Sequence, residues 1–262
     1  IFNYEELASK KTEPPYVGDV WMDGIQVMVA REKEGSPEGL YLAAKGGHNA
    51  ESHNHNDVGS CIIFVDGLPG IIDVGVETYT KKTFSAQRYE IWTMQSQFHN
   101  LPTINGKMQL PGRQCCASNV RYEATDEEAV FSLDIQKAYP ADAGAKCYNR
   151  TYRMHRKNGD AYIDITDTFA FENESNTVSL NFMIWKKPEI TGEGLIKVEI
   201  DAETCFYMSF DKGNTKVDAM HCDTSDARLR HVWGDEGVYR ISMTKTVPKE
   251  GSFSVRIYKD LG

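Results

Sequence analysis

A histidine-rich segment at residues 52–57, Ser-His-Asn-His-Asn-Asp, is the first place in this sequence where residue types and spacing could do chemistry. On an extended strand, residues two apart point to the same face, so the imidazoles of His53 and His55 converge on one point. Imidazole and carboxylate are ordinary zinc ligands, and Asp73 and His99 are candidates for the remaining ligands. The spacing therefore predicts a metal site, although a polar loop that hydrogen-bonds its own backbone explains the same residue types.

Cationic and aromatic side chains follow the histidine-rich segment. Arg88 lies close to it in sequence, so the local potential there can oppose the net charge of −9. Tyr79 and Tyr89 can stack on sugar rings, whereas Trp92 fits a core position equally well. We therefore expect Arg88, Tyr79 and Tyr89 to contact substrate, and the neighbouring lysine pair 81–82 to form a solvated loop.

Length, composition and charge limit the class of protein. The chain has 262 residues, of which 40% are hydrophobic and 26% are charged, as in an ordinary globular protein. The net charge of −9 argues against binding to nucleic acid or to an anionic membrane, because both require a basic face. No stretch approaches the ~18 apolar residues of a transmembrane helix. We expect neither nucleic acid nor membrane as a partner.

Six cysteines are scattered along the chain without the C-x-x-C spacing of zinc fingers. We expect most of them to be small buried apolar residues in strands, and the sequence leaves their pairing open. The first residues, from Ile1, lack both an initiator methionine and the pattern of a signal peptide. We therefore expect the chain to be a piece of a longer polypeptide.

Two hairpins are predicted from strand-forming runs around short turns. Residues 25–31 and 40–45 flank the turn-rich segment 34–39. Residues 151–157 and 161–166 flank Asn158-Gly159-Asp160, and Asn-Gly between such runs is the strongest short-range hairpin signal. Further strands are expected at 178–185, 195–200, 205–210, 228–233, 238–244 and 252–258.

Little helix is predicted. Residues 1–15 form a short helix or arm that ends at two prolines, and residues 85–93 form one or two helical turns with Ser85 as N-cap. Many strands with Gly, Asn and Asp turns between them are typical of a large antiparallel β-sandwich of two packed sheets. We therefore predict an all-β fold and a single domain over residues 1–262.

Four short segments resemble the signature of the heparinase II/III-like polysaccharide lyases. They are KGGHNAESHNHNDVGS at residues 45–60, IDVGVETYT at 72–80, FS at 84–85 with RY at 88–89, and SQFHN at 96–100. Their order and spacing make the resemblance specific over roughly residues 40–110. The remainder of the chain resembles the family only as a generic β-sandwich.

This resemblance implies an N-terminal helical toroid, a β-sandwich domain, and an active site in the cleft between them. It implies a zinc held by His55, Asp73 and His99, with His53 as the catalytic histidine at the cleft. It also implies that the helical domain supplies a Tyr, and an Asn or His, for proton transfer and carboxylate neutralisation. We expect residues 1–262 to contain no helical toroid, which departs from the family pattern. We therefore expect the parent protein to be a carbon–oxygen lyase and the chain alone to be catalytically incomplete.

The implied substrate is an acidic polysaccharide that contains uronic acid, of the glycosaminoglycan or alginate type, in the periplasm or outside a bacterial cell. β-Elimination needs a base and an acid near C5 and O4, and histidine can act as either. Neutralisation of the carboxylate must accompany enolate formation. If His55 binds zinc, the metal fixes the loop that aims His53, so its role is mainly structural.

Two alternatives remain open from the residues. Gly47, five intervening residues and His53-x-His55 match the start of the first cupin motif, which favours a cupin-like metal-binding sandwich. The Glu that the motif needs is replaced by the segment 58–61, and no second motif surrounds His99. The other alternative is a non-catalytic carbohydrate-binding module.

Overall fold

The computed structural model describes residues 3–10, 14–156 and 160–259, and antiparallel strands dominate them. The two α-helices are α1 (Tyr4–Ser9) and α2 (Ala227–Trp233). The strands are β1 (Asp19–Met22), β2 (Val27–Arg31), β3 (Leu40–Lys45), β4 (His48–Asn49), β5 (Cys61–Val65), β6 (Leu68–Ile71), β7 (Pro102–Ile104), β8 (Gly112–Cys116), β9 (Ser118–Ala124), β10 (Glu128–Asp134), β11 (Ala145–His155), β12 (Tyr162–Ile184), β13 (Glu189–Ile190), β14 (Leu195–Glu199), β15 (Cys205–Phe210), β16 (Lys216–Cys222) and β17 (Val238–Lys259). Short 3-10 turns occupy Asp23–Ile25, Lys82–Phe84, Arg88–Glu90, Trp92–Met94, Ser96–Phe98, Gln136–Ala138 and Ala141–Ala143.

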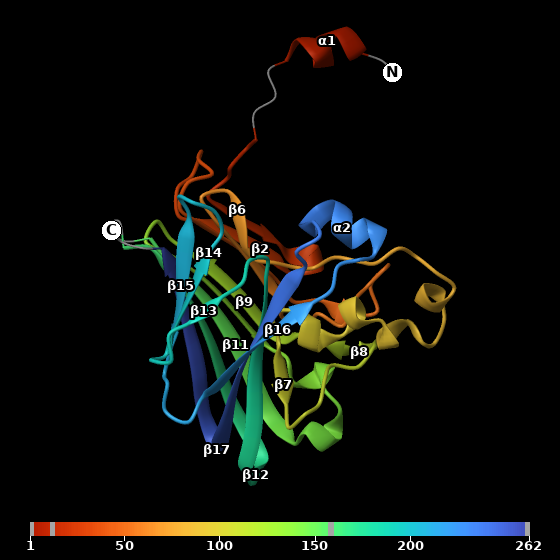
Figure 1. Ribbon diagram of the computed structural model, residues 1–262, viewed down its shortest axis with the longest axis vertical. Coiled ribbons are helices and arrows are strands. Elements are labelled where there is room, and N and C mark those ends of the chain that lie inside the picture. Colours follow the sequence, from red (N-terminus) through yellow and green to blue (C-terminus); the bar gives the residue numbers. More distant parts are fainter. Residues whose placement is uncertain (1–2, 11–13, 157–159, 260–262) are drawn as a thin grey trace.

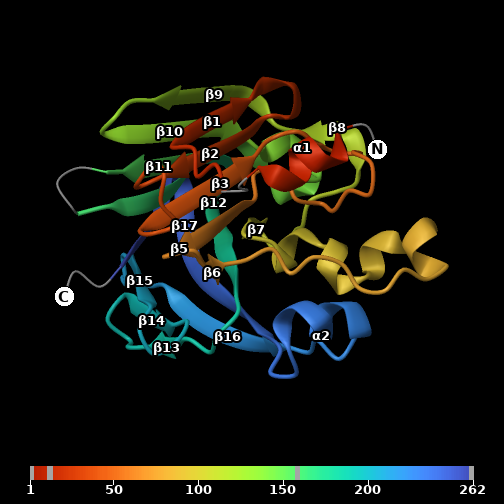
Figure 2. The ribbon, with the colours of Figure 1, turned by 90° about the horizontal axis from the view of Figure 1, so that it is seen from above.

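The strands form a sandwich around one large core. Hydrogen bonds connect fifteen strands, ten of them along the path β1-β2-β3-β5-β6-β12-β17-β15-β14-β13 and the other five, β7, β9, β10, β11 and β16, beside it, while β4 pairs separately with β8. The red and orange strands of the first third lie across the green and blue strands (Figures 1 and 2). Buried side chains of β2, β3 and β5 belong to the same apolar cluster as those of β11, β12 and β17. The predicted all-β, antiparallel β-sandwich with little helix is therefore confirmed.

Alternating burial explains why the first strands form. In β2, the side chains of Met28 and Ala30 are buried, while their neighbours are half-exposed. β3 and β5 alternate in the same way, with Leu42 and Ile63 fully buried. This period of two is the pattern of a strand with one face on the core. It confirms the first predicted hairpin, because β2 and β3 pair with Val29 opposite Ala43.

The two longest strands, β12 and β17, place the segments on which the candidate site is built. They pair from Tyr162 opposite Tyr258 to Ile184 opposite Tyr239. β12 also pairs with β6 through Ile184 and Ile71 and with β7 along residues 178–180. The end of β6 and the start of β7 therefore both lie against β12, which brings Asp73 and His99 close in space.

Several predicted elements differ from the structure. The strands predicted at 161–166 and 178–185 are parts of the single strand β12 (Tyr162–Ile184), and those predicted at 238–244 and 252–258 are parts of β17, so long continuous strands replace pairs of short ones. β11 and β12 do pair as a hairpin, whose turn lies outside the described residues. The helical turns expected at 85–93 are 3-10 turns, and Ser85 is not their N-cap, because Gln87 and Ile91 occupy those positions.

The strand predicted at 228–233 is wrong, because these residues form helix α2. Leu229 and Trp233 are both buried, and a spacing of four puts them on one helical face. Asp226 caps the start by accepting hydrogen bonds from the amides of Arg228 and Leu229. Neither helix in the described part of the chain is long and apolar enough to cross a membrane.

All six cysteines are free thiols. The expectation that most are buried holds for half of them, since Cys61, Cys115 and Cys222 are buried and Cys147 is exposed. Because these thiols are unpaired, the fold depends on its core and hydrogen bonds rather than on disulfides.

Candidate metal centre and catalytic wall

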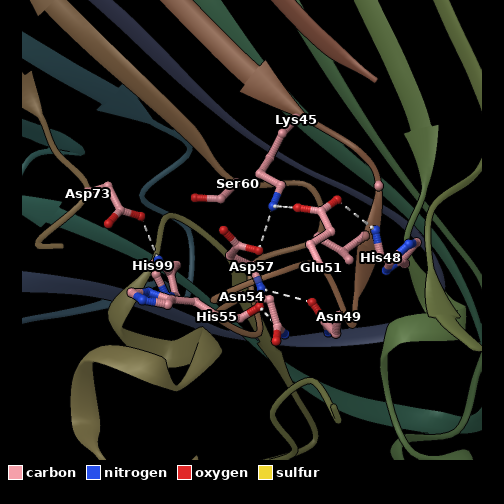
Figure 3. Close-up of polar contacts among 12 residues, drawn as sticks. Lys45, His48, Asn49, Glu51, Asn54, His55, Asp57, Ser60, Asp73 and His99 are labelled. Atoms are coloured by element: carbon pink, nitrogen blue, oxygen red, sulfur yellow. Dashed lines mark hydrogen bonds and ion pairs between the residues drawn. The ribbon is translucent and has the colours of Figure 1, made fainter. Parts of the chain in front are cut away.

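Three of the residues predicted as metal ligands come together in space. One ligand atom from each of His55, Asp73 and His99 lies within 4.8 Å of the others. His99 Nδ1 is 2.8 Å from Asp73 Oδ2, and the rings of His55 and His99 are 5.2 Å apart (Figure 3). Asp73 follows the end of β6, His99 ends the 3-10 turn Ser96–Phe98, and His55 lies in the loop before β5.

The electrostatics of this cluster fit a cation. Burial lowers the pKa of His55 to about 4, which leaves its imidazole neutral with a free lone pair at pH 7. Burial alone raises the pKa of Asp73, but His99, His55 and the amide of Gly75 outweigh it and hold that pKa below its usual range. Burial likewise opposes protonation of His99, yet Asp73 raises its pKa above the ordinary value. A metal ion that binds through a ring nitrogen of His99 competes with a proton for that nitrogen.

The strongest sign that a metal ion fits this cluster comes from His99. Its side chain is 1% exposed, and Nε2 is buried without a hydrogen-bond partner among the described residues. A buried polar atom without a partner is costly. Asp73 is 36% exposed, so the cluster is reachable from solvent. Two imidazoles and one carboxylate form a common zinc ligand set, and the residues therefore fit the zinc that the sequence resemblance implies.

His53 lies apart from this cluster. The prediction that His53 and His55 converge from one strand is wrong, because residues 51–60 form a loop and His53 has φ = 57°. This left-handed conformation interrupts the extended backbone on which residues two apart would share a face. His53 is exposed, and its ring stacks nearly parallel to Tyr79, with centroids 6.1 Å apart.

Arg88 and Tyr89 hold the loop that carries His53. Arg88 donates from Nε and Nη2 to the carbonyl of Asn54 at 3.2 and 2.8 Å, and from Nη1 to the carbonyl of Thr83 at 2.9 Å. Tyr89 donates to Asn54 Oδ1 at 3.2 Å. These contacts fix the residue between the two histidines. Direct contact of Arg88 and Tyr89 with substrate stays a prediction.

Two aromatic residues border the loop in different ways. Tyr79 is 37% exposed and lies between His53 and Phe84, with the guanidinium of Arg228 5.3 Å from its ring centroid. Trp92 is half-buried, and its indole donates to Glu77 Oε1 at 2.8 Å. Tyr79 is therefore the aromatic that presents a surface beside His53.

An ion-pair network beside the loop was not predicted from the sequence. Lys45 Nζ contacts Asp57 Oδ1 at 2.8 Å and Glu51 Oε2 at 3.2 Å (Figure 3). Burial lowers the pKa of Lys45, but the two carboxylates reverse this effect and raise it. Asn49 accepts from the amide of Asp57 at 3.1 Å. The network closes the loop 46–60 onto the end of β3, and only the presence of Lys, Glu and Asp within the signature segment could have indicated it.

Asn100 is the second contributor that sequence reasoning missed. It is fully buried and donates to the carbonyls of Cys61 and Ile72 at 2.6 and 2.9 Å. Its own carbonyl accepts from Arg150 Nη1 at 2.6 Å, and Arg150 is paired with Asp167 inside the core. Asn100, which follows His99, is therefore hydrogen-bonded to Ile72, which precedes Asp73.

Comparisons with known proteins identify the family. The family model described as Heparinase II/III-like, C-terminal, matches residues 24–239. The chain belongs to the heparinase II/III-like family. The family prediction is thus confirmed, and the cupin-like alternative is not retained. No curated protein matches the sequence.

Solved structures resemble this heparinase II/III-like domain in fold. The heparan sulfate lyase HepC from Pedobacter heparinus aligns with a TM-score of 0.75 and 14% identity, covering 98% of this chain and 38% of that chain. A heparinase III gene product aligns with a TM-score of 0.73, 14% identity and the same coverages. A 4-alpha-glucanotransferase from Thermococcus litoralis aligns at 0.52 with 12% identity, covering 94% of this chain and 40% of that one. The chain spans about two fifths of the length of each.

Proposed function

We propose that this chain is the sandwich domain of a polysaccharide lyase that cleaves uronic-acid-containing glycans, of glycosaminoglycan or alginate type, by β-elimination. One observation carries the proposal: in a heparinase II/III-like chain, an exposed His53 lies two residues from His55, which belongs to a partly buried cluster of potential metal ligands. The cluster can fix the loop, and the exposed histidine is free to meet substrate. The non-catalytic carbohydrate-binding alternative becomes an outcome of the test below.

A zinc ion is the proposed occupant of the cluster, held by His55, Asp73 and His99. When bound, the metal supplies charge and fixed geometry that join the 46–60 loop to the ends of β6 and of the 3-10 turn Ser96–Phe98. The protein alone already brings two of these segments together through the hydrogen bond between His99 and Asp73. We therefore propose a mainly structural role for the metal.

His53 is the proposed proton-transfer group. β-Elimination breaks the C5–H and C4–O bonds of a uronate and forms a C4–C5 double bond. A base takes the C5 proton, and an acid protonates the departing O4. His53 can carry either proton because its ring is exposed, while Tyr79 and the clamped Asn54 hold it in one orientation.

The opposite wall of the cleft is proposed to belong to an N-terminal helical domain of the same polypeptide. Support comes from the coverage of about two fifths of each structural relative. That domain must neutralise the uronate carboxylate and supply the second proton-transfer group. A periplasmic or secreted location is proposed because polymeric acidic glycans lie outside the cytoplasm.

The test is an assay of the parent protein that contains this chain. We expect acidic polysaccharides to give products with the ultraviolet absorbance of an unsaturated uronate, and His53→Ala to abolish that signal. His231→Ala is the matched control, since His231 is an exposed histidine on α2 and has no role in the proposal. Products with new reducing ends but no unsaturation, or an unaffected His53→Ala variant, would contradict the proposal.

A further inference from the structure

A pocket on the outer face of the first strands has a composition that the proposed function does not use. It has a volume of about 350 Å³ and is lined chiefly by Tyr16, Arg31, Pro37, Tyr41, Phe64 and Gly67. Small-molecule sites have volumes of about 300–1,000 Å³. Arg31, Tyr41 and Phe64 form one cross-strand row, because Tyr41 pairs with Arg31 on one side and with Phe64 on the other. The strands β2, β3 and β5 that carry the row lie side by side in Figure 2.

Two tyrosine rings hold the Arg31 guanidinium in place. Its central carbon is 4.4 Å from the ring centroid of Tyr41 and 5.1 Å from that of Tyr16. Tyr16 adopts φ = 35°, and its carbonyl accepts from the amide of Gly35 at 2.9 Å. The backbone amide of Arg31 in turn donates to the carbonyl of Gly18 at 2.7 Å. The cation is therefore stacked and fixed before any ligand arrives.

Arg31 has aromatic contacts but no anionic partner. Within the described residues it forms no ion pair, and its Nε is buried without a hydrogen-bond partner. The described residues that line the pocket include no carboxylate. A guanidinium presents several donors in a planar fork that matches a carboxylate or a sulfate. Unused donors beside an aromatic wall thus favour an anionic ligand with an apolar face.

A second arginine on the surface shows the contrasting arrangement. Arg256 lies 3.8 Å from the ring centroid of Tyr162, so it also makes a cation–π contact. Its Nε and Nη2 donate to the two carboxylate oxygens of Asp164 at 2.8 and 2.9 Å. Of these two arginines, Arg256 is therefore already paired, whereas Arg31 keeps its fork for an external anion.

We propose that the Arg31 pocket is a second, non-catalytic binding site for an acidic saccharide. It shares no lining residue with the proposed catalytic wall, which is formed by His53 and Tyr79. The guanidinium pairs with a carboxylate or sulfate group of the sugar, and the rings of Tyr41 and Phe64 pack against the sugar's apolar face. The choice of a glycan as ligand rests on the proposed function, whereas the choice of an anion rests on Arg31 itself. Such a site holds a polymer on the domain without taking part in bond cleavage.

Calorimetric titration of this chain with defined tetrasaccharides tests the proposal. The probes are a heparosan tetrasaccharide, which carries carboxylates but no sulfate, a heparin tetrasaccharide, which carries both, and neutral maltotetraose. We expect both acidic probes to bind, and Arg31→Ala and Tyr41→Ala to raise Kd by about tenfold or more. Arg31→Gln keeps the stem of the side chain and should weaken binding equally. Equal affinity for the two acidic probes assigns the carboxylate as the group recognised, and preference for heparin assigns the sulfate.

Two control variants separate this site from the proposed catalytic wall. Arg256→Ala should leave Kd unchanged, because its guanidinium is already paired. His53→Ala should also leave it unchanged, even if it abolishes activity of the parent protein. The proposal is overturned if neither acidic probe binds, if maltotetraose binds equally well, or if His53→Ala removes binding while Arg31→Ala does not. The last result would place the saccharide at the His53 wall and leave the proposed function intact.

Discussion

The side-chain amide of Asn100 donates a 2.9 Å hydrogen bond to the carbonyl of Ile72, so the neighbours of His99 and Asp73 are joined directly. Asn100 Oδ1 also accepts from the amide of Met183 in β12 at 2.7 Å. One buried side chain therefore sets the distance between the segments that carry two of the three proposed metal ligands. Removing a group that orients metal ligands in this way typically lowers metal affinity by about 10–100-fold.

We predict that Asn100→Ala weakens zinc binding by about 10–100-fold, measured by competition with a chromophoric chelator. Removing the amide frees the carbonyl of Ile72, so the spacing between Asp73 and His99 is no longer fixed. Asn176→Ala is the matched control, because Asn176 is also buried and hydrogen-bonded through its side chain but lies away from the cluster. If both variants lose stability yet bind zinc as the unmodified chain does, Asn100 only supports the fold.

Zinc should raise the melting temperature of the chain and of His53→Ala, but not of His99→Ala. A ligand present at 100 times its Kd stabilises a folded protein by about 2.7 kcal/mol. For a domain of this size, that corresponds to an increase of roughly 5–10 °C. Comparing each variant with and without zinc removes the cost of deleting the buried His99 side chain. An equal zinc-dependent shift in the two variants would show that the ligand roles are assigned wrongly.

The hairpins were predictable because their signals are local, and the family resemblance grouped His55, Asp73 and His99, which the structure brings together. The turn between residues 31 and 40 and the alternating burial on either side of it fix β2 and β3. The helix α2 was missed because Leu229 and Trp233 lie four residues apart, a spacing that fits one face of a strand as well as one face of a helix, whereas the cap that Asp226 provides decides for the helix. The direction of His53 was missed for a related reason, since its left-handed backbone depends on the clamp that Arg88 makes from 34 residues away.

Breaking the buried ion pair of the core should be far more damaging than breaking an exposed one. Arg150 and Asp167 are 1% and 0% exposed, and the pair also anchors Asn100. We expect Asp167→Asn to lower the free energy of unfolding by about 3–5 kcal/mol in denaturant titrations, because it leaves a buried guanidinium unpaired. Asp164→Asn removes the exposed partner of Arg256 and should cost about 0–1 kcal/mol. A similar loss of unfolding free energy in the two variants would show that the buried ion pair stabilises the fold no more than the surface pair does.

The thiols should differ sharply in reactivity. Burial raises the pKa of Cys61 to about 12, so almost no thiolate exists at pH 8. Cys147 is exposed. In the folded chain at pH 8, we expect iodoacetamide to modify Cys147 and to spare Cys61, as read by peptide mass spectrometry. Modification of Cys61 before unfolding would mean that β5 opens far more readily than its burial implies.

The final prediction is that this chain alone folds and binds zinc but shows negligible lyase turnover. Elimination needs carboxylate neutralisation, a base and an acid around one sugar, and this domain offers His53 with Tyr79 from one side only. Losing one catalytic partner costs orders of magnitude in rate, and losing a whole wall also removes substrate positioning.

The measurement follows unsaturated uronate by its ultraviolet absorbance, with the chain incubated separately with heparin, heparan sulfate, chondroitin sulfate and alginate. The parent protein serves as the positive control, and circular dichroism of the chain confirms that inactivity is not unfolding. Addition of the separately produced helical domain should restore part of the rate, because the two walls then reassemble around the sugar. Robust product from the chain alone would show that His53 and its neighbours need no second wall, and would contradict the division of labour proposed here.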